Sequence, residues 1–150
     1  MLAGVALLSL QAAPARAQAA VAAAAQASPD ALAAVRRQPR AYHGSVGRRF
    51  LHVGLGPTGP DGRFEGAAVL LDADGRVVAS GPVHGRADGP SCRLQITLGD
   101  IAAQLDGTCR ESTLSGTLDE RRRRPFDLVR FLAAKGDEHT VGEVWLTAGA

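Results

Sequence analysis

The stretch that most constrains the fold is Ser91–Arg110, because it holds both cysteines and the most regular alternation in the chain. Apolar and polar residues take turns on either side of Gly99-Asp100. The apolar positions are Cys92, Leu94, Ile96, Leu98, Ile101, Ala103, Leu105 and Cys109. Alternation with a period of two is typical of strands that bury one face. Because the connection is short, we expect the two strands to pair as an antiparallel hairpin.

The register of this hairpin determines whether the two cysteines meet. We expect Leu98 to lie opposite Ala103. The same register places Cys92 directly opposite Cys109, which is within bridging distance. A disulfide that closes a loop of this size contributes roughly 3 kcal/mol in a chain-entropy treatment. A metal site would need further ligands close to the cysteines in the sequence, and none lies within a few residues of either.

The first 17 residues have the composition of a secretory signal peptide. Leu2–Leu10 is a short apolar run, and Ala15-Arg16-Ala17 fits the small-x-small rule for cleavage. No basic residue precedes the apolar run, which departs from the usual pattern. We expect residues 1–17 to be removed and the mature protein to be periplasmic or secreted, where a disulfide persists. No stretch is apolar over a length that would span a bilayer as a helix.

Residues 18–41 are interpreted as a tether of low order rather than a second domain. Gln18–Ala27 is almost entirely Ala and Gln, with no large apolar side chain to hold it on a core. Ser28-Pro29-Asp30 has the pattern that begins a short helix, and Pro39 ends it. Residues 42–150 then form a single β-barrel domain.

The remainder of the chain consists of short alternating segments separated by Gly, Pro and Asp. The predicted strands are Arg48–Leu55, Arg63–Asp72, Arg76–Arg86, Ser91–Leu98, Ala103–Arg110, Thr113–Asp119, Phe126–Leu132 and Val141–Thr147. After Pro39 no segment keeps a helical apolar period long enough to cover a sheet. The predicted class is therefore all-β, with about eight short antiparallel strands in a meander barrel or, alternatively, a two-sheet sandwich.

Glycines inside the predicted strands favour the barrel, because they permit the sharp coiling that closes a small one. They are Gly54, Gly66, Gly81, Gly107, Gly116 and Gly142. The segments 105–109 and 114–118 also repeat one another loosely, as successive strands of a meander do. Over residues 48–148 this pattern resembles the small up-and-down barrels of lipocalin-like proteins. The resemblance implies the architecture alone.

Two motifs match the sequence signatures of ligand-binding loops but lack the structural context that binding requires. Gly54–Gly59 reads GLGPTG, but a dinucleotide site needs a helix that starts at this loop, and Pro57 and Pro60 prevent one. Asp72–Gly75 resembles the start of a calcium loop without its third oxygen ligand or closing glutamate. We interpret both as turns between strands, and no cofactor is expected.

The candidate metal ligands are His52 and His84, which lie on predicted strands with their side chains outward. A simple meander places another strand between them, so surface histidines are the simpler interpretation. No Gly-x-Ser-x-Gly motif is present, and the cysteines are assigned to the disulfide. No catalytic residue is therefore named, and we expect a protein that is not an enzyme.

Charge gives two further expectations. A formal net charge of +2 argues against a nucleic-acid-binding protein. The dense basic run comprises Arg121, Arg122, Arg123 and Arg124 and is predicted to form a turn. It is either a solvated hairpin tip or a contact for an anionic partner such as a lipid head group, a polysaccharide or an acidic protein.

Apolar residues on both parities of Phe126–Leu132 and Val144–Leu146 suggest either cover by the N-terminal helix or an exposed partner surface. The sequence thus predicts an exported, non-enzymatic barrel that binds a small apolar ligand or an envelope protein. Its Leu-, Val-, Ala- and Gly-rich interior would leave a narrow, weakly polar cavity. The alternatives are a small periplasmic metal-dependent hydrolase using His52 or His84, and an inhibitor of an exported protease whose tether enters the protease cleft.

Overall fold

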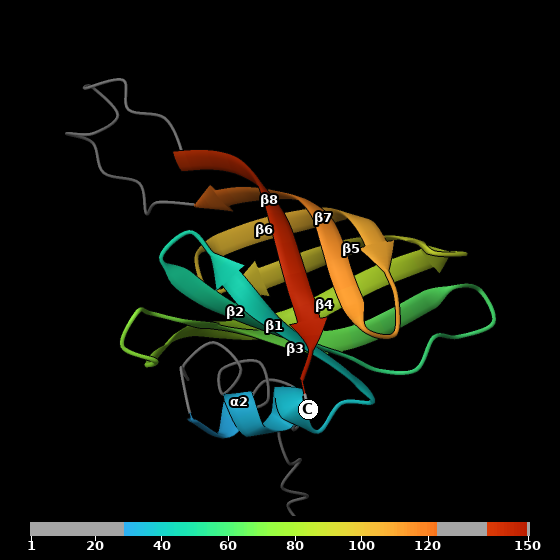
Figure 1. The fold of residues 1–150 in the computed structure, drawn as a ribbon, viewed down its shortest axis with the longest axis horizontal. Helices are drawn as coiled ribbons and strands as arrows, with labels where there is room; N and C mark the ends of the chain where they lie inside the picture. Colours follow the sequence, from blue (N-terminus) through green and yellow to red (C-terminus); the bar gives the residue numbers. More distant parts are fainter. Residues whose placement is uncertain (1–28, 123–137, 150) are drawn as a thin grey trace, which may run out of the picture.

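A computed structural model describes residues 29–122 and 138–149, which form one short helix and a closed antiparallel barrel of eight strands in sequence order (Figure 1). The elements are α2 (Pro29–Arg36), β1 (Arg40–Val46), β2 (Arg49–Leu55), β3 (Arg63–Leu71), β4 (Val77–Asp88), β5 (Ser91–Leu98), β6 (Ile101–Cys109), β7 (Thr113–Arg122) and β8 (Glu138–Ala148). The predicted all-β meander barrel is confirmed, and the two-sheet alternative is wrong. No helix among these residues has the length and apolar character needed to cross a membrane.

The interior of the barrel is filled by the apolar positions of the strands. Leu94, Leu105 and Leu114 have no exposed surface, and Ile96 is 1% exposed. Fully burying a side chain of this kind stabilises a fold by about 1.5–3 kcal/mol. The void at the centre measures only about 10 Å³. That is no more than one water molecule requires, so this void has no room for a ligand.

The β5–β6 hairpin has a tighter turn than the sequence suggested. Leu98 pairs with Ile101 rather than with Ala103, so Gly99 and Asp100 alone form the turn. Gly99 has a φ of 61°, a left-handed conformation that glycine adopts without steric cost. The expected register is therefore wrong by two residues, because an alternating pattern fixes which face a residue occupies but not its partner.

The disulfide nevertheless forms between Cys92 and Cys109, with the two Cα atoms 5.7 Å apart. Cys92 pairs with Gly107, so the bridge joins diagonal positions rather than directly opposite ones. Both sulfurs keep the inward parity because a shift of two residues preserves the face. The predicted pairing is confirmed, although the register argument for it is wrong.

The first strand, β1, was missed. Gly44 and Ser45 interrupt its apolar pattern, and Tyr42 is the only large apolar residue before Val46. The strand predicted at Phe126–Leu132 lies outside the described residues, as does the expected signal peptide at 1–17.

The helix α2 covers the outer face of β3. Val35 is buried against Val69 and Leu71, whose side chains point away from the barrel interior. Figure 1 shows α2 beside the wall formed by β1, β2 and β3. The helix therefore does not cover the apolar residues of β8, where Trp145 is 65% exposed.

Candidate ligand-binding cleft

The barrel closes through a short contact between its first and last strands. Only Tyr42–Ala148 and His43–Thr147 pair between β1 and β8 in the described part of the chain. The strands still approach closely at Gly44, where a Cβ atom would lie 2.6 Å from the backbone oxygen of Trp145. Beyond this point β1 and β8 separate, and a cleft of about 430 Å³ opens beside the β1–β2 turn.

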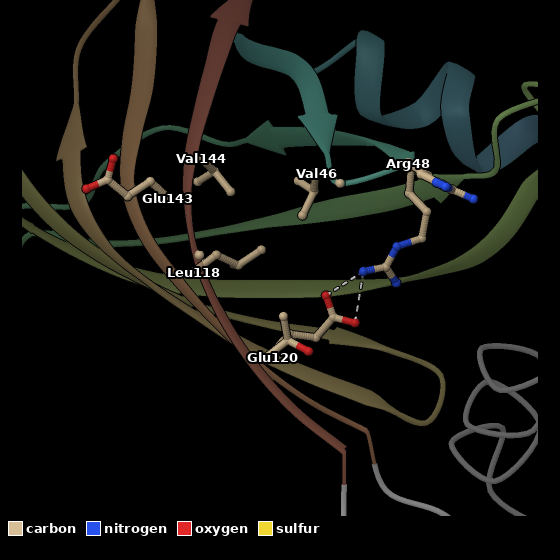
Figure 2. Close-up of a pocket in the computed structure, with 10 residues that line it drawn as sticks. Val46, Arg48, Leu118, Glu120, Glu143 and Val144 are labelled. Atoms are coloured by element: carbon tan, nitrogen blue, oxygen red, sulfur yellow. Dashed lines mark hydrogen bonds and ion pairs between the residues drawn. The ribbon is translucent and has the colours of Figure 1, made fainter.

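The cleft is lined by residues of four strands and one turn. They are Val46, Gly47, Arg48, Arg49, Leu118, Glu120, Thr140, Gly142, Glu143 and Val144. Figure 2 shows Val46, Leu118 and Val144 facing the same space, while Glu143 points away from it. The apolar wall continues into the barrel, because Val46, Leu118 and Glu120 also line the small central void.

A missing side chain leaves part of this space empty. Gly142 lies on the inward parity of β8, two residues before the buried Val144, and pairs with Leu118 of β7. Among the described residues, a Cβ atom at Gly142 would meet nothing within 4 Å. The cleft thus exists partly because the chain places glycine where a larger side chain would otherwise fill the gap.

An ion pair forms the polar end of the cleft. Arg49 of β2 and Glu120 of β7 share the inward parity of their strands, and one guanidinium nitrogen of Arg49 lies 2.8 Å and 3.1 Å from the two carboxylate oxygens of Glu120. The Glu120 side chain is 16% exposed and the Arg49 side chain 30%. Sequence reasoning missed the pair, although both residues share the parity of buried neighbours on their strands.

The charges around the cleft balance one another. Arg49 neutralises Glu120, and among the described residues the rim carries one further basic residue, Arg48, and one further acidic residue, Glu143. A charged ligand at the inner end of the cleft would have to displace a partner of the Arg49–Glu120 pair, which would leave a half-buried charge without its counterion. The arrangement therefore favours an uncharged molecule that has an apolar body and a hydrogen-bonding end.

The disulfide lies at the far ends of β5 and β6 from the cleft. Next to it on the outer face, Arg93 and Asp106 form an ion pair, and Gln104 donates a second hydrogen bond to the same carboxylate at 2.6 Å. These hydrogen bonds, first that from Arg93 and then that from Gln104, hold the pKa of Asp106 below its usual value. This cluster braces the outer face of the hairpin and takes no part in the cleft.

The structure does not bring the two candidate metal ligands together. His52 on β2 and His84 on β4 are separated by β3. His84 lies beside Glu65, with 3.7 Å between a ring nitrogen and a carboxylate oxygen. His52 instead stacks against His43 of β1, which sequence reasoning had not paired with it.

The described part of the basic run belongs to a strand. Arg121 and Arg122 belong to β7, and Arg123 and Arg124 lie outside the described residues. Arg121 is 3.6 Å from a carboxylate oxygen of Asp119, and Arg122 is 3.8 Å from one of Asp100. The turn predicted for all four arginines is therefore wrong for the first two, because the β6–β7 pairing extends as far as Arg122.

The two fingerprint-like motifs lie in turns, as expected. The GLGPTG segment leads from β2 into the loop before β3, where the Gly59 N–H donates to the Arg63 oxygen at 2.8 Å. In the β3–β4 turn the Asp72 carboxylate accepts hydrogen bonds from the backbone N–H groups of Asp74 and Arg76, each at 2.9 Å. Neither loop is followed by the helix that a dinucleotide site needs.

Comparisons with known proteins add no family to this picture. No family model matches the chain, and no curated protein or solved structure matches it.

Proposed function

We propose that this protein is an exported, non-enzymatic binding domain that holds a small, uncharged and mostly apolar molecule in the cleft between β1 and β8. The observation that carries the proposal is an apolar-walled cleft of about 430 Å³ that ends at the Arg49–Glu120 pair. Sites for small molecules have this size and this combination of apolar walls with a few polar groups. An enclosed lipocalin-like site is not proposed, because the central void is too small.

The expected affinity is modest, because the apolar surface that a ligand buries in an open cleft must also offset the free-energy cost of association.

Export is supported by the disulfide together with the N-terminal sequence. A bridge between the two cysteines is compatible with an oxidising compartment, and Leu2–Leu10 has the character of a signal peptide. An envelope protein as the partner, the metal-dependent hydrolase and the protease inhibitor stay predictions that no observation in the cleft favours.

The first experiment uses N-phenyl-1-naphthylamine, an uncharged aromatic fluorophore that brightens in apolar sites. We expect saturable binding to the oxidised protein, with one molecule per chain. The Gly142→Leu variant should abolish binding by filling the cleft, and its Cβ atom would meet no described atom within 4 Å. Val141→Leu is the matched control, because Val141 is the adjacent, outward-facing residue and is 58% exposed.

The outcomes separate the cleft from other apolar surfaces. Loss of binding in Gly142→Leu with retention in Val141→Leu supports the proposal. Equal binding by both variants would place the probe elsewhere, for example on the exposed Trp145. Native mass spectrometry of protein purified from its own compartment then identifies the natural ligand. A bare mass under gentle conditions would count against a carrier.

A further inference from the structure

A second candidate site lies on the outer wall of the barrel, away from the cleft. His43 of β1 pairs directly with His52 of β2, and both side chains point outward. Their ring centroids are 5.6 Å apart, with 27° between the ring planes. The rings border a separate surface hollow of about 520 Å³, together with Val35, Arg36, Tyr42 and Gly149.

The distance between the two ring centres is close to that of a chelate. Two imidazoles that share one metal ion at about 2.0–2.1 Å hold their ring centres roughly 5 Å apart. The rings are stacked with 27° between their planes, so both must turn about their side-chain bonds before a nitrogen of each can point at one ion, and the hollow beside them leaves room for this. Among the described residues, neither ring makes a side-chain hydrogen bond that such a rotation would break.

We propose that His43 and His52 form a two-imidazole site for a divalent late first-row metal ion, with Cu²⁺ bound most tightly. Imidazole is a preferred ligand of Cu²⁺, Ni²⁺ and Zn²⁺, and affinities for such ligands peak at Cu²⁺. Tetragonal Cu²⁺ accepts two nitrogen ligands and completes its coordination with water oxygens from the hollow. Structural Zn²⁺ sites instead take four protein ligands, which this pair does not supply.

Burial, followed by the neighbouring His43 and Arg36, holds the pKa of His52 below its ordinary value of 6.5. The guanidinium of Arg36, the last residue of α2, is the charged group that opposes a cation here, and its exposure to solvent screens the repulsion.

The test is calorimetric titration of the full, oxidised chain with Cu²⁺ alone, in a buffer that does not bind metal. We expect one Cu²⁺ per chain. In His43→Ala and in His52→Ala the dissociation constant should rise at least tenfold. The double variant should bind Cu²⁺ more weakly than either single variant, because each single variant keeps one imidazole ligand. His84→Ala is the matched control, since His84 is another strand histidine with an outward side chain.

Two further readouts exclude a merely structural effect of the substitutions. Electron paramagnetic resonance of the loaded protein should show coupling to two imidazole nitrogens, reduced to one in His43→Ala. Arg36→Gln should tighten Cu²⁺ binding by about two- to threefold, because it removes a nearby positive charge. His43 is exposed, so its variant is expected to fold even if His52→Ala does not.

Unchanged Cu²⁺ affinity in both histidine variants would overturn the proposal, as would the absence of stoichiometric binding. Neither result would bear on the proposed cleft ligand. The two sites have separate lining residues, and the cleft test uses an organic probe without metal.

Discussion

Removal of the disulfide tests the structural role assigned to the cysteines. Cys92 and Cys109 are 17 residues apart in the sequence, and a cross-link over a loop of this length restricts the unfolded chain by about 3 kcal/mol. Cys92 is also packed in the core at 6% exposure, so replacement by alanine adds a small packing loss. The Cys92→Ala, Cys109→Ala double variant should therefore lose about 3–4 kcal/mol of unfolding free energy.

The loss should appear in urea unfolding followed by far-ultraviolet circular dichroism and extrapolated linearly to water. The variant should still fold, because small domains have about 5–15 kcal/mol of stability and the Gly99-Asp100 turn keeps its register. The wild-type protein in reductant serves as the control and should match the variant within about 1 kcal/mol. A loss smaller than about 1 kcal/mol would refute the view that the bridge restricts the unfolded chain.

Three other substitutions test the packing of the barrel. Gly107→Ala should be strongly destabilising, because the added Cβ would collide with the backbone of Ser115 and Gly116, whereas Gly142→Ala should change the urea midpoint little. Tyr42→Phe should cost about 1 kcal/mol, since the buried hydroxyl donates to the Arg110 oxygen at 2.7 Å. Burial, partly offset by Arg40, raises the pKa of Tyr42 in the folded protein. The unfolded chain therefore loses its phenol proton at a lower pH than the folded one, and the free energy of unfolding should decrease as the pH rises above about 10. This loss of stability at alkaline pH should be absent in Tyr42→Phe. Because the chain has one tyrosine, tyrosinate absorbance reports the titration of Tyr42 directly. A titration midpoint near pH 10 in the folded protein would contradict the raised pKa.

The architecture was predictable because alternation, turn residues and cysteine content are local signals. Ser91–Leu98 was predicted with its observed bounds, and the Asp72–Gly75 turn follows from its own residues. The β5–β6 register was not predictable from the pattern, since Leu98 opposite Ile101 and Leu98 opposite Ala103 leave the same faces buried.

The sites were harder to predict because they depend on contacts between distant segments. The cleft exists where β1 and β8 cease to pair, and nothing in either strand alone marks that point. Gly107 and Gly142 look alike in the sequence, yet a Cβ atom would collide with backbone at the first and meet empty space at the second. The His43–His52 pair was missed with β1 itself, because Gly44 and Ser45 concealed that strand.

The most direct test of the cleft is a two-dimensional amide nitrogen–proton spectrum of the oxidised protein titrated with N-phenyl-1-naphthylamine. The proposal predicts that the perturbed amides belong to the turn at Val46–Arg49, to Leu118–Glu120 of β7 and to Gly142–Val144 of β8. Amides near Cys92 and Cys109, at the other end of their strands, should not shift. Shifts confined to those amides or to the surroundings of Trp145, or no saturable shifts at all, would contradict the proposal that the cleft is the binding site.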